Sequence, residues 1–233
     1  MSERTRWALR GVAGLAGLPA IVLMSAMIGF GGLAREAGLT LPQVVFATFG
    51  VWALPSMIVL VGSITAGLGL LPTAMAVALA SVRFTPMVMS LVAEVRDSRT
   101  RTLTLYALSH FVAITAWVHG TSNFPRIPRQ YRTAFFGGFA IALAAMSTVV
   151  AAISHQVTGA LPTPAAAALV FLTPIYFLTA LWAAARLPSD RPALLAGLVA
   201  GPLAQWLLPS AGLVVGGVVA GTLAYLWTRS RAR

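Results

Sequence analysis

The stretch LLPTAMAVALASVRFTPMVMSLV, Leu70–Val92, is mostly apolar and contains a single charged residue, Arg83. It is longer than the roughly 20 apolar residues that a transmembrane helix needs. An arginine at the centre of such a helix costs about 2.5–3.5 kcal/mol on insertion, whereas each Leu, Ile, Phe or Val returns only about 0.3–0.6 kcal/mol. The stretch therefore predicts a transmembrane helix whose guanidinium has a partner or a task.

The whole chain has the composition of an integral membrane protein. Of its 233 residues, 58% are hydrophobic and 9% are charged, and the mean hydropathy is +0.87, whereas an ordinary soluble domain has roughly 25% charged residues. We expect an all-α polytopic membrane protein, with residues 1–233 forming one transmembrane domain of about eight helices. The expected helices are Gly11–Ala34, Pro42–Ile64, Leu70–Ala93, Leu103–Val118, Ala134–Ile153, Ala165–Ala185, Ala193–Leu208 and Leu213–Trp227. Only the motif PSAG at Pro209 separates the last two, which form either a helical hairpin or one re-entrant unit.

The distribution of arginine predicts an orientation. All 16 basic residues are arginines, and most lie in segments that would share one side of the membrane with both termini. Arginine marks the cytoplasmic side, so both termini are expected in the cytoplasm, and the chain in the cytoplasmic (inner) membrane. The cluster Arg96–Arg101 would then lie outside, as the main exception. We interpret the net charge of +11 as anchoring to the lipid bilayer and not as nucleic-acid binding, because the arginines flank helices.

An internal similarity predicts a repeat. The segment GLLPTAMAVALASVRFTPMVMSLVAEVR from Gly69 resembles GALPTPAAAALVFLTPIYFLTALWAAAR from Gly159. The same shift pairs residues 11–93 with 103–185, and three helices per copy make the two copies inverted in the membrane. Residues 193–227 would form an accessory helix pair. The alternative is chance similarity between helices rich in alanine and leucine.

Three prolines at expected mid-membrane positions indicate broken helices. Pro55, Pro86 and Pro174 cannot donate a backbone hydrogen bond, so each should free a carbonyl four residues earlier. A freed carbonyl in a membrane needs a new partner or a polar cavity. These sites, with Trp52 and Ser56 beside Pro55, are therefore candidate substrate contacts; the alternative is that the prolines only bend helices.

Arg83 and His110 are the candidate charged and titratable groups of the site. Arg83 has no counterpart in the second copy and no aspartate or glutamate deep within an expected helix, so its partner is predicted to be a carboxylate of the substrate. Its alternative role is to cross-link freed carbonyls. His110 shares a helical face with Tyr106 and Trp117 and is a candidate proton relay or a neutral structural histidine.

Other chemistry is not indicated. His119 and His155 lie at expected helix ends, where an exposed interfacial role is the default. No nucleophile elbow, His-Glu-x-x-His motif or buried carboxylate pair is present, so an enzyme is not expected. The absence of cysteine excludes disulfides and thiolate metal sites, and we expect neither a metal nor a cofactor. Besides a transporter, a non-transporting membrane scaffold or the binding subunit of another transport system stays open.

The first part of the chain resembles a known family. The order of Leu18-Pro19, the motif EAGL, VWALPSM and SVRFTPMVMSL is similar to the AzlC family, the large permease subunit of branched-chain amino acid exporters. Ser81 and Met57 stand where the family has Asn and Gln, and Ser109-His110 where many members have Asp-Glu, whereas Arg83 is retained. The resemblance implies a secondary transporter that exports branched-chain or other small amino acids with a small AzlD-like membrane subunit. The candidate substrate-binding residues are Arg83, Ser81, Pro86, Trp52, Pro55, Ser56, His110 and Pro174.

Overall fold

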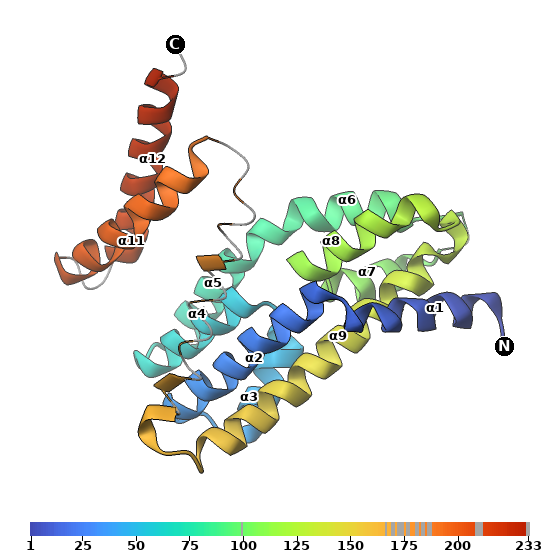
Figure 1. Ribbon diagram of the computed structural model, residues 1–233, viewed down its shortest axis with the longest axis horizontal. Coiled ribbons are helices and arrows are strands. Elements are labelled where there is room, and N and C mark those ends of the chain that lie inside the picture. Colours follow the sequence, from blue (N-terminus) through green and yellow to red (C-terminus); the bar gives the residue numbers. More distant parts are fainter. Residues whose placement is uncertain are drawn as a thin grey trace. The chain divides into compact units, whose positions relative to one another are not determined.

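The computed structural model describes residues 1–98, 100–165, 167–168, 171, 175, 178–179, 182, 185, 188–207 and 212–231. It divides into two compact units, residues 1–173 and 174–233, and each is described by itself. The described elements are helices (Figure 1). In the first unit they are α1 (Glu3–Ala13), α2 (Leu18–Glu36), α3 (Leu41–Phe46), α4 (Leu54–Thr65), α5 (Leu70–Ser81), α6 (Thr85–Val95), α7 (Thr102–His110), α8 (Ile114–Asn123) and α9 (Arg129–Thr158).

The frame of the first unit is the pair formed by α2 and the long α9. The two helices run in the same direction, because Gly31 in α2 packs on Ala151 while α1, which precedes α2, packs on the start of α9 at Phe135. Phe30, Phe136 and Phe139 are fully buried in this unit. The expected first span begins at Leu18 and not at Gly11, because a 3₁₀ turn and an extended Gly17 end α1.

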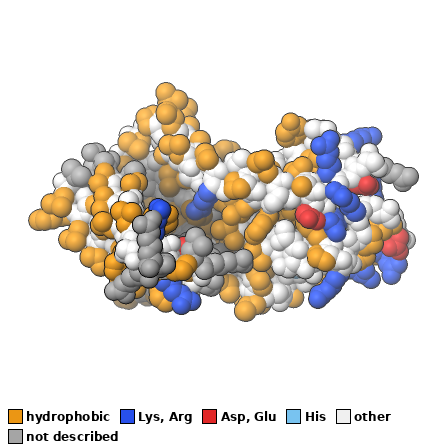
Figure 2. All heavy atoms as spheres, turned by 90° about the horizontal axis from the view of Figure 1, so that it is seen from above, with side chains coloured by type: hydrophobic (Ala, Val, Ile, Leu, Met, Phe, Trp, Pro, Cys, Tyr) orange, Lys and Arg blue, Asp and Glu red, His pale blue; other side chains and the backbone are white. Residues whose placement is uncertain are grey.

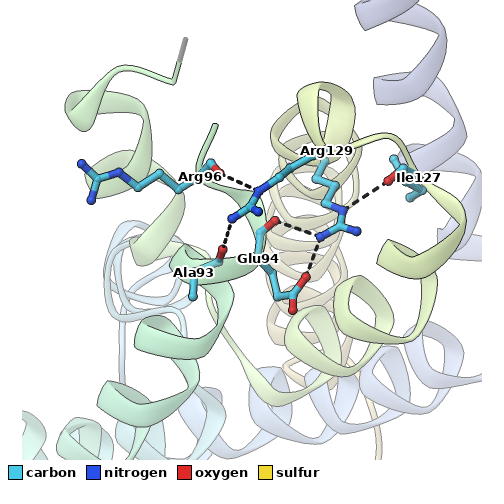
Figure 3. A network of polar contacts seen from close by, with 6 residues as sticks. Ala93, Glu94, Arg96, Ile127 and Arg129 are labelled. Atoms are coloured by element: carbon cyan, nitrogen blue, oxygen red, sulfur yellow. Dashed lines mark hydrogen bonds and ion pairs between the residues drawn. The ribbon is translucent and has the colours of Figure 1, made fainter. Parts of the chain in front are cut away.

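A second long element, α5–α6, runs from one end of the unit to the other. A 3₁₀ turn at Val82–Phe84 joins the two helices. At the end of α6, Arg129 Nε donates to the carbonyl of Arg96 (3.0 Å) and its Nη2 to that of Ala93 (2.8 Å). Arg132 is bonded to Glu94 and also donates to the carbonyl of Ile127 (Figure 3). We call this end, where α6 ends and α9 begins, the arginine end.

The expected second span is instead a hairpin that enters and returns at the opposite end. Its first arm, α3, starts beside the end of α9, where the carbonyl of Leu39 contacts His155 Nε2 (2.7 Å). A π-helical turn at Ala47–Val51 continues α3 to Trp52 and Ala53, which are not helical. The second arm, α4, then runs back and is antiparallel to α5, as the Ser56–Ser81 contact across the 66–69 turn shows. We call Leu41–Thr65 hairpin one.

The expected fourth span is a hairpin from the arginine end. α7 begins just after α6 ends, and the chain leaves the helix at Phe111–Ala113. α8 then returns along the first half of α9, with Gly120 packed on Phe136. Its end reaches the arginine end, where the guanidinium of Arg132 lies over the ring of Phe124. We call Thr102–Asn123 hairpin two; Figure 1 shows the two hairpins entering from opposite ends of the unit.

These hairpins correct the expected count of crossings. Within the described residues, three helical stretches are long and apolar enough to cross a membrane: Leu18–Glu36, Leu70–Val95 and Arg129–Thr158. Pro42–Ile64 and Leu103–Val118 are not among them, because each is broken at its middle and the chain turns back there. The described arginines of the expected outer cluster, Arg96 and Arg101, share an end with the arginines of α1 and of the 126–132 segment. Figure 2 shows basic side chains gathered at this end, on the right of the view.

The predicted repeat is not shown by the described residues. A 90-residue shift pairs expected spans two and five, yet span two is interrupted whereas span five lies within the continuous α9. Expected span four is interrupted at its middle as expected span two is, although the predicted repeat does not pair these two spans. Most of expected span six, including Pro174, lies outside the described residues.

The second unit contains α11 (Asp190–Leu207) and α12 (Gly212–Arg231). These helices correspond to the last two expected spans and pack against each other, with Gly216 close to the carbonyl of Ala200. A Cβ at Gly216 would lie 3.0 Å from that oxygen, so the small residue permits this approach.

The hairpins predict an unusual labelling pattern for single cysteines, which the chain otherwise lacks. Glu36→Cys and Ala66→Cys flank hairpin one, and both should react with a membrane-impermeant maleimide from the same side. Ser98→Cys and Arg126→Cys flank hairpin two, and both should react only from the other side. If either flanking pair is labelled from two different sides, that hairpin crosses the membrane and the described fold is wrong.

Candidate functional site

Three interruptions of helical structure lie at one level in the first unit. They are the tip of hairpin one, the α5–α6 junction and the tip of hairpin two, and we call them together the tip region. The Ser56–Ser81 contact places the first tip beside the junction. Val88 and Ser109 line one crevice between α6 and α7, and the Trp117 indole N–H donates to Ser90 Oγ at 2.9 Å. These contacts place the second tip level with the start of α6.

The two hairpin tips touch each other through His110 and Phe49. His110 Nε2 lies 2.9 Å from the carbonyl oxygen of Phe49. A carbonyl oxygen only accepts, so Nε2 carries the hydrogen of this bond. The ring of Phe49 also packs edge-on against Phe111, with 5.8 Å between centroids. The tips are therefore joined by one polar and one aromatic contact, although they belong to hairpins of opposite direction.

Trp52 turns the chain at the tip of hairpin one. Its φ of 44° and ψ of 38° are left-handed, a conformation that L side chains other than Asn and Asp rarely adopt. The side chain is 3% exposed, and its Nε1 is buried without a hydrogen-bond partner in the described part of the chain. Strained backbone and unpaired buried donors persist where the fold enforces them, and they cluster at functional sites.

Two serines fasten hairpin one to α5. Ser81 Oγ donates to the carbonyl of Val77 at 2.8 Å and lies 3.0 Å from Ser56 Oγ, so Ser56 is the donor between the two hydroxyls. Ser56 is fully buried and Ser81 half-buried. The predicted candidates Ser56 and Ser81 are thus in contact.

Arg83 lies in the 3₁₀ turn at the α5–α6 junction and is exposed on the first unit. Its guanidinium carbon is 4.9 Å from the centroid of the Phe84 ring. Among the described residues no carboxylate is within ion-pair distance of it. This arrangement leaves the fork of the guanidinium available to an anion.

The prolines act differently from the prediction. Pro55 and Pro86 lie in the first turns of α4 and α6, where a backbone N–H has no helical partner in any case. The carbonyl of Val82, expected to be freed by Pro86, accepts from the N–H of Thr85. These two prolines therefore begin helices after a break. Pro174 lies outside the described residues.

The histidines also depart from expectation. Because the chain breaks after His110, Trp117 belongs to another helix and does not continue a stripe with it. His119 is half-buried and stacks on Phe139, with 3.9 Å between ring centroids. His155 is 1% exposed and not interfacial.

Sequence reasoning missed Phe49, whose backbone carbonyl, not its side chain, makes the polar contact. It also missed the Ser90–Trp117 bond. A carbonyl left without a helical partner has no signature in residue type. The available signal was length, since Leu103–Val118 is shorter than the roughly 20 residues of a crossing helix.

The fold and site define a class: a helical, multi-pass membrane protein in which two oppositely inserted hairpins meet between long apolar helices. The comparison with protein families narrows this class. The family model AzlC protein matches residues 19–161, more than half of the chain, and the chain belongs to the AzlC family. This is a family of transporters, so the protein is not an enzyme. No curated protein and no solved structure matches it.

Proposed function

We propose that the protein is the large subunit of a secondary transporter that exports branched-chain or other small amino acids across the cytoplasmic membrane. Membership of the AzlC family supports this class of substrate and a small AzlD-type partner. The observation that carries the proposal is the meeting of the two hairpin tips at the α5–α6 junction. Interrupted helices at a common depth supply polar groups to a substrate inside a membrane.

The proposed substrate site is the tip region, and its chemistry suits an amino acid. Arg83 would bind the carboxylate with its planar fork. Ser81 precedes Arg83 by two residues and contacts Ser56, and the Trp52 indole N–H belongs to the same hairpin as Ser56. Phe49 and Phe111 offer apolar surface for an aliphatic side chain.

The proposed orientation places the arginine end in the cytoplasm. The described basic residues of the first unit at this end are Arg4, Arg6, Arg10, Arg96, Arg101, Arg126, Arg129 and Arg132, against Arg35 at the other end. An excess of arginine on the cytoplasmic side supports this orientation, with the N-terminus inside. We propose that the C-terminus is also cytoplasmic.

Transport assays in proteoliposomes test the function. The chain would be reconstituted alone and with a small AzlD-type subunit, and radiolabelled valine, leucine, alanine and lysine would be supplied. We expect exchange of the aliphatic amino acids and none of lysine, with faster exchange when the partner is present. Absence of exchange of all four with the partner present would contradict the proposal and favour a scaffold or a binding subunit.

The contact between the tips predicts the behaviour of His110 variants. His110→Phe removes the donor to the Phe49 carbonyl, and a lost hydrogen bond of about 1–1.5 kcal/mol corresponds to a roughly tenfold effect. We therefore expect His110→Phe to slow exchange about tenfold. His110→Gln retains a donor and should be within about threefold of wild type. Equal exchange rates for the two variants would show that this hydrogen bond has no part in transport.

A further inference from the structure

A row of buried polar side chains runs along the second half of α9. Ser147, Ser154, His155 and Thr158 are spaced by seven, one and three residues, so they share one face of the helix. All four are buried. We call them the polar row. It begins near the end of the unit opposite the arginine end and rises toward the tip of hairpin one, because Thr148 and Ala145 line a crevice together with Phe49 and Gly50.

Most of the polar row lacks protein partners. Ser154 Oγ donates to the carbonyl of Ile28 at 2.6 Å. In the described chain, however, Ser147 Oγ, His155 Nδ1 and Thr158 Oγ1 have no hydrogen-bond partner. An unsatisfied polar group away from water typically costs about 1–3 kcal/mol. Three such groups on one helix face therefore point to an occupant that forms hydrogen bonds, such as water.

The geometry of His155 fixes which nitrogen is free. Its Nε2 is 2.7 Å from the carbonyl oxygen of Leu39, and since that oxygen only accepts, Nε2 carries the hydrogen. In the neutral ring Nδ1 then has a lone pair and no protein donor. A proton can bind to Nδ1 and leave it again while the Nε2–H bond to Leu39 stays intact.

Few charged groups surround His155. The elements packed against it are α2, the 37–40 turn and α3, and their only charged side chains are Arg35 and Glu36, both exposed. The Arg35 guanidinium lies against Gly159, just beyond Thr158. Thus no carboxylate is fixed beside the ring within the described residues, and the titratable group of the row is His155 itself.

We propose that His155 is the proton-binding residue that couples transport to a proton gradient, and that water reaches its Nδ1 along the polar row when the proton is exchanged. This inference rests on the proposed function and names its coupling ion. A proton entering beyond Thr158 binds Nδ1, making an imidazolium. Ser147 lies two helical turns nearer the level of the hairpin tips, on the same face of α9. Release returns the proton from Nδ1 to water.

The test compares two rates in proteoliposomes that contain the amino acid transported by the wild type. One is accumulation driven by an imposed pH gradient, and the other is exchange at equal pH on both sides. His155→Gln keeps a donor for the Leu39 carbonyl but cannot take up a proton. We expect it to lose gradient-driven accumulation at least tenfold and to retain exchange within about twofold.

Control variants separate this role from a structural one. His119→Gln changes a half-buried histidine whose Nε2 also has no partner among the described residues, and it should retain both rates. Thr158→Val and Ser147→Ala remove unpaired hydroxyls, so they should not lower the melting temperature, yet each should slow accumulation severalfold.

The possible outcomes distinguish a failure of the proton-binding role of His155 from a failure of the proposed transport function. His155→Gln protein that still accumulates substrate, or that loses both rates equally, overturns the assignment. Wild-type exchange without any response to a pH gradient overturns the proton coupling alone. Wild-type protein with no exchange overturns the proposed function and this inference together.

Discussion

Arg83→Ala protein is expected to bind its amino acid more than a hundredfold more weakly than wild type. Arg83 is the one arginine at the level of the tip region in the described residues, and its guanidinium has no carboxylate partner there. Arg83 is exposed, so the applicable estimate is that of hydrogen bonds to a charged group, about 1.5–3 kcal/mol each. The two bonds of a bidentate carboxylate pair then amount to about 3 kcal/mol or more, and every 1.4 kcal/mol is a factor of about ten in affinity. Binding would be measured by scintillation proximity with labelled substrate on purified protein.

Two further variants are compared with Arg83→Ala: a conservative substitution at the same residue and a substitution at a distant arginine. Arg83→Lys keeps the charge but loses the bidentate fork, so its affinity should fall less than that of Arg83→Ala. Arg101→Ala removes an exposed arginine at the arginine end and should leave affinity unchanged. Correctly folded Arg83→Ala protein with wild-type affinity would remove Arg83 from the site. A variant that fails to fold would mean that the residue is structural.

The second large effect is expected from Gly31→Val, which should prevent accumulation of folded protein in the membrane. A Cβ at Gly31 would lie 2.4 Å from the carbonyl oxygen of Ala151 and 2.7 Å from Ser154 Cβ. Relief requires α2 to move away from α9, since helical backbone on both sides cannot yield locally. Overpacking of this kind costs about 1–3 kcal/mol or more.

Gly62→Val is the matched control for this change, because a Cβ at Gly62 meets nothing within 4 Å. Both glycines lie inside helices, so propensity changes equally in the two variants. Yield and monodispersity in detergent, measured by fluorescence-detected size exclusion, should fall for Gly31→Val only. Equal behaviour of the two variants would show that α2 and α9 do not make the described close contact.

Composition and apolar runs were enough to predict the helical membrane class, because burial of about 20 apolar residues in lipid dominates the energetics. The run around Arg83 forms α5–α6, a helical stretch that is long and apolar enough to cross a membrane. The family was also recognisable from the order of motifs between Leu18 and Leu91, within the matched residues 19–161.

The hairpins were not predictable in the same way. Leu41–Thr65 has the length and hydropathy of a crossing helix, and only the backbone of Trp52 and Ala53 turns it back. At the second tip, the residues Phe111–Ala113 include neither glycine nor proline, so local sequence carries no break signal there. Contacts with α9 and between the tips decide both turns, and such tertiary contacts have no fixed spacing along the chain.

Pro55 and Pro86 illustrate a partial success. They do mark interruptions, as predicted, but they begin new helices instead of leaving carbonyls free within old ones. The polar groups at the tips come from elsewhere, namely the Phe49 carbonyl, the Trp52 indole and the two serines. The prolines therefore indicated where the helices are interrupted, but they did not indicate which polar groups lie at the interruptions.

The hydrogen bonds of Arg129 and Arg132 to the end of α6 have a mechanical consequence. Their guanidinium groups hold carbonyls of Ala93, Glu94 and Arg96, so α6 and α9 are clamped together at one end. Within the described residues, the two hairpin tips are joined to each other by a single hydrogen bond, between His110 and the Phe49 carbonyl. Sliding α6 along α9 would break the hydrogen bonds of both arginines, whereas separating the two tips breaks one, so we expect the clamped pair to be the stationary part when a hairpin moves.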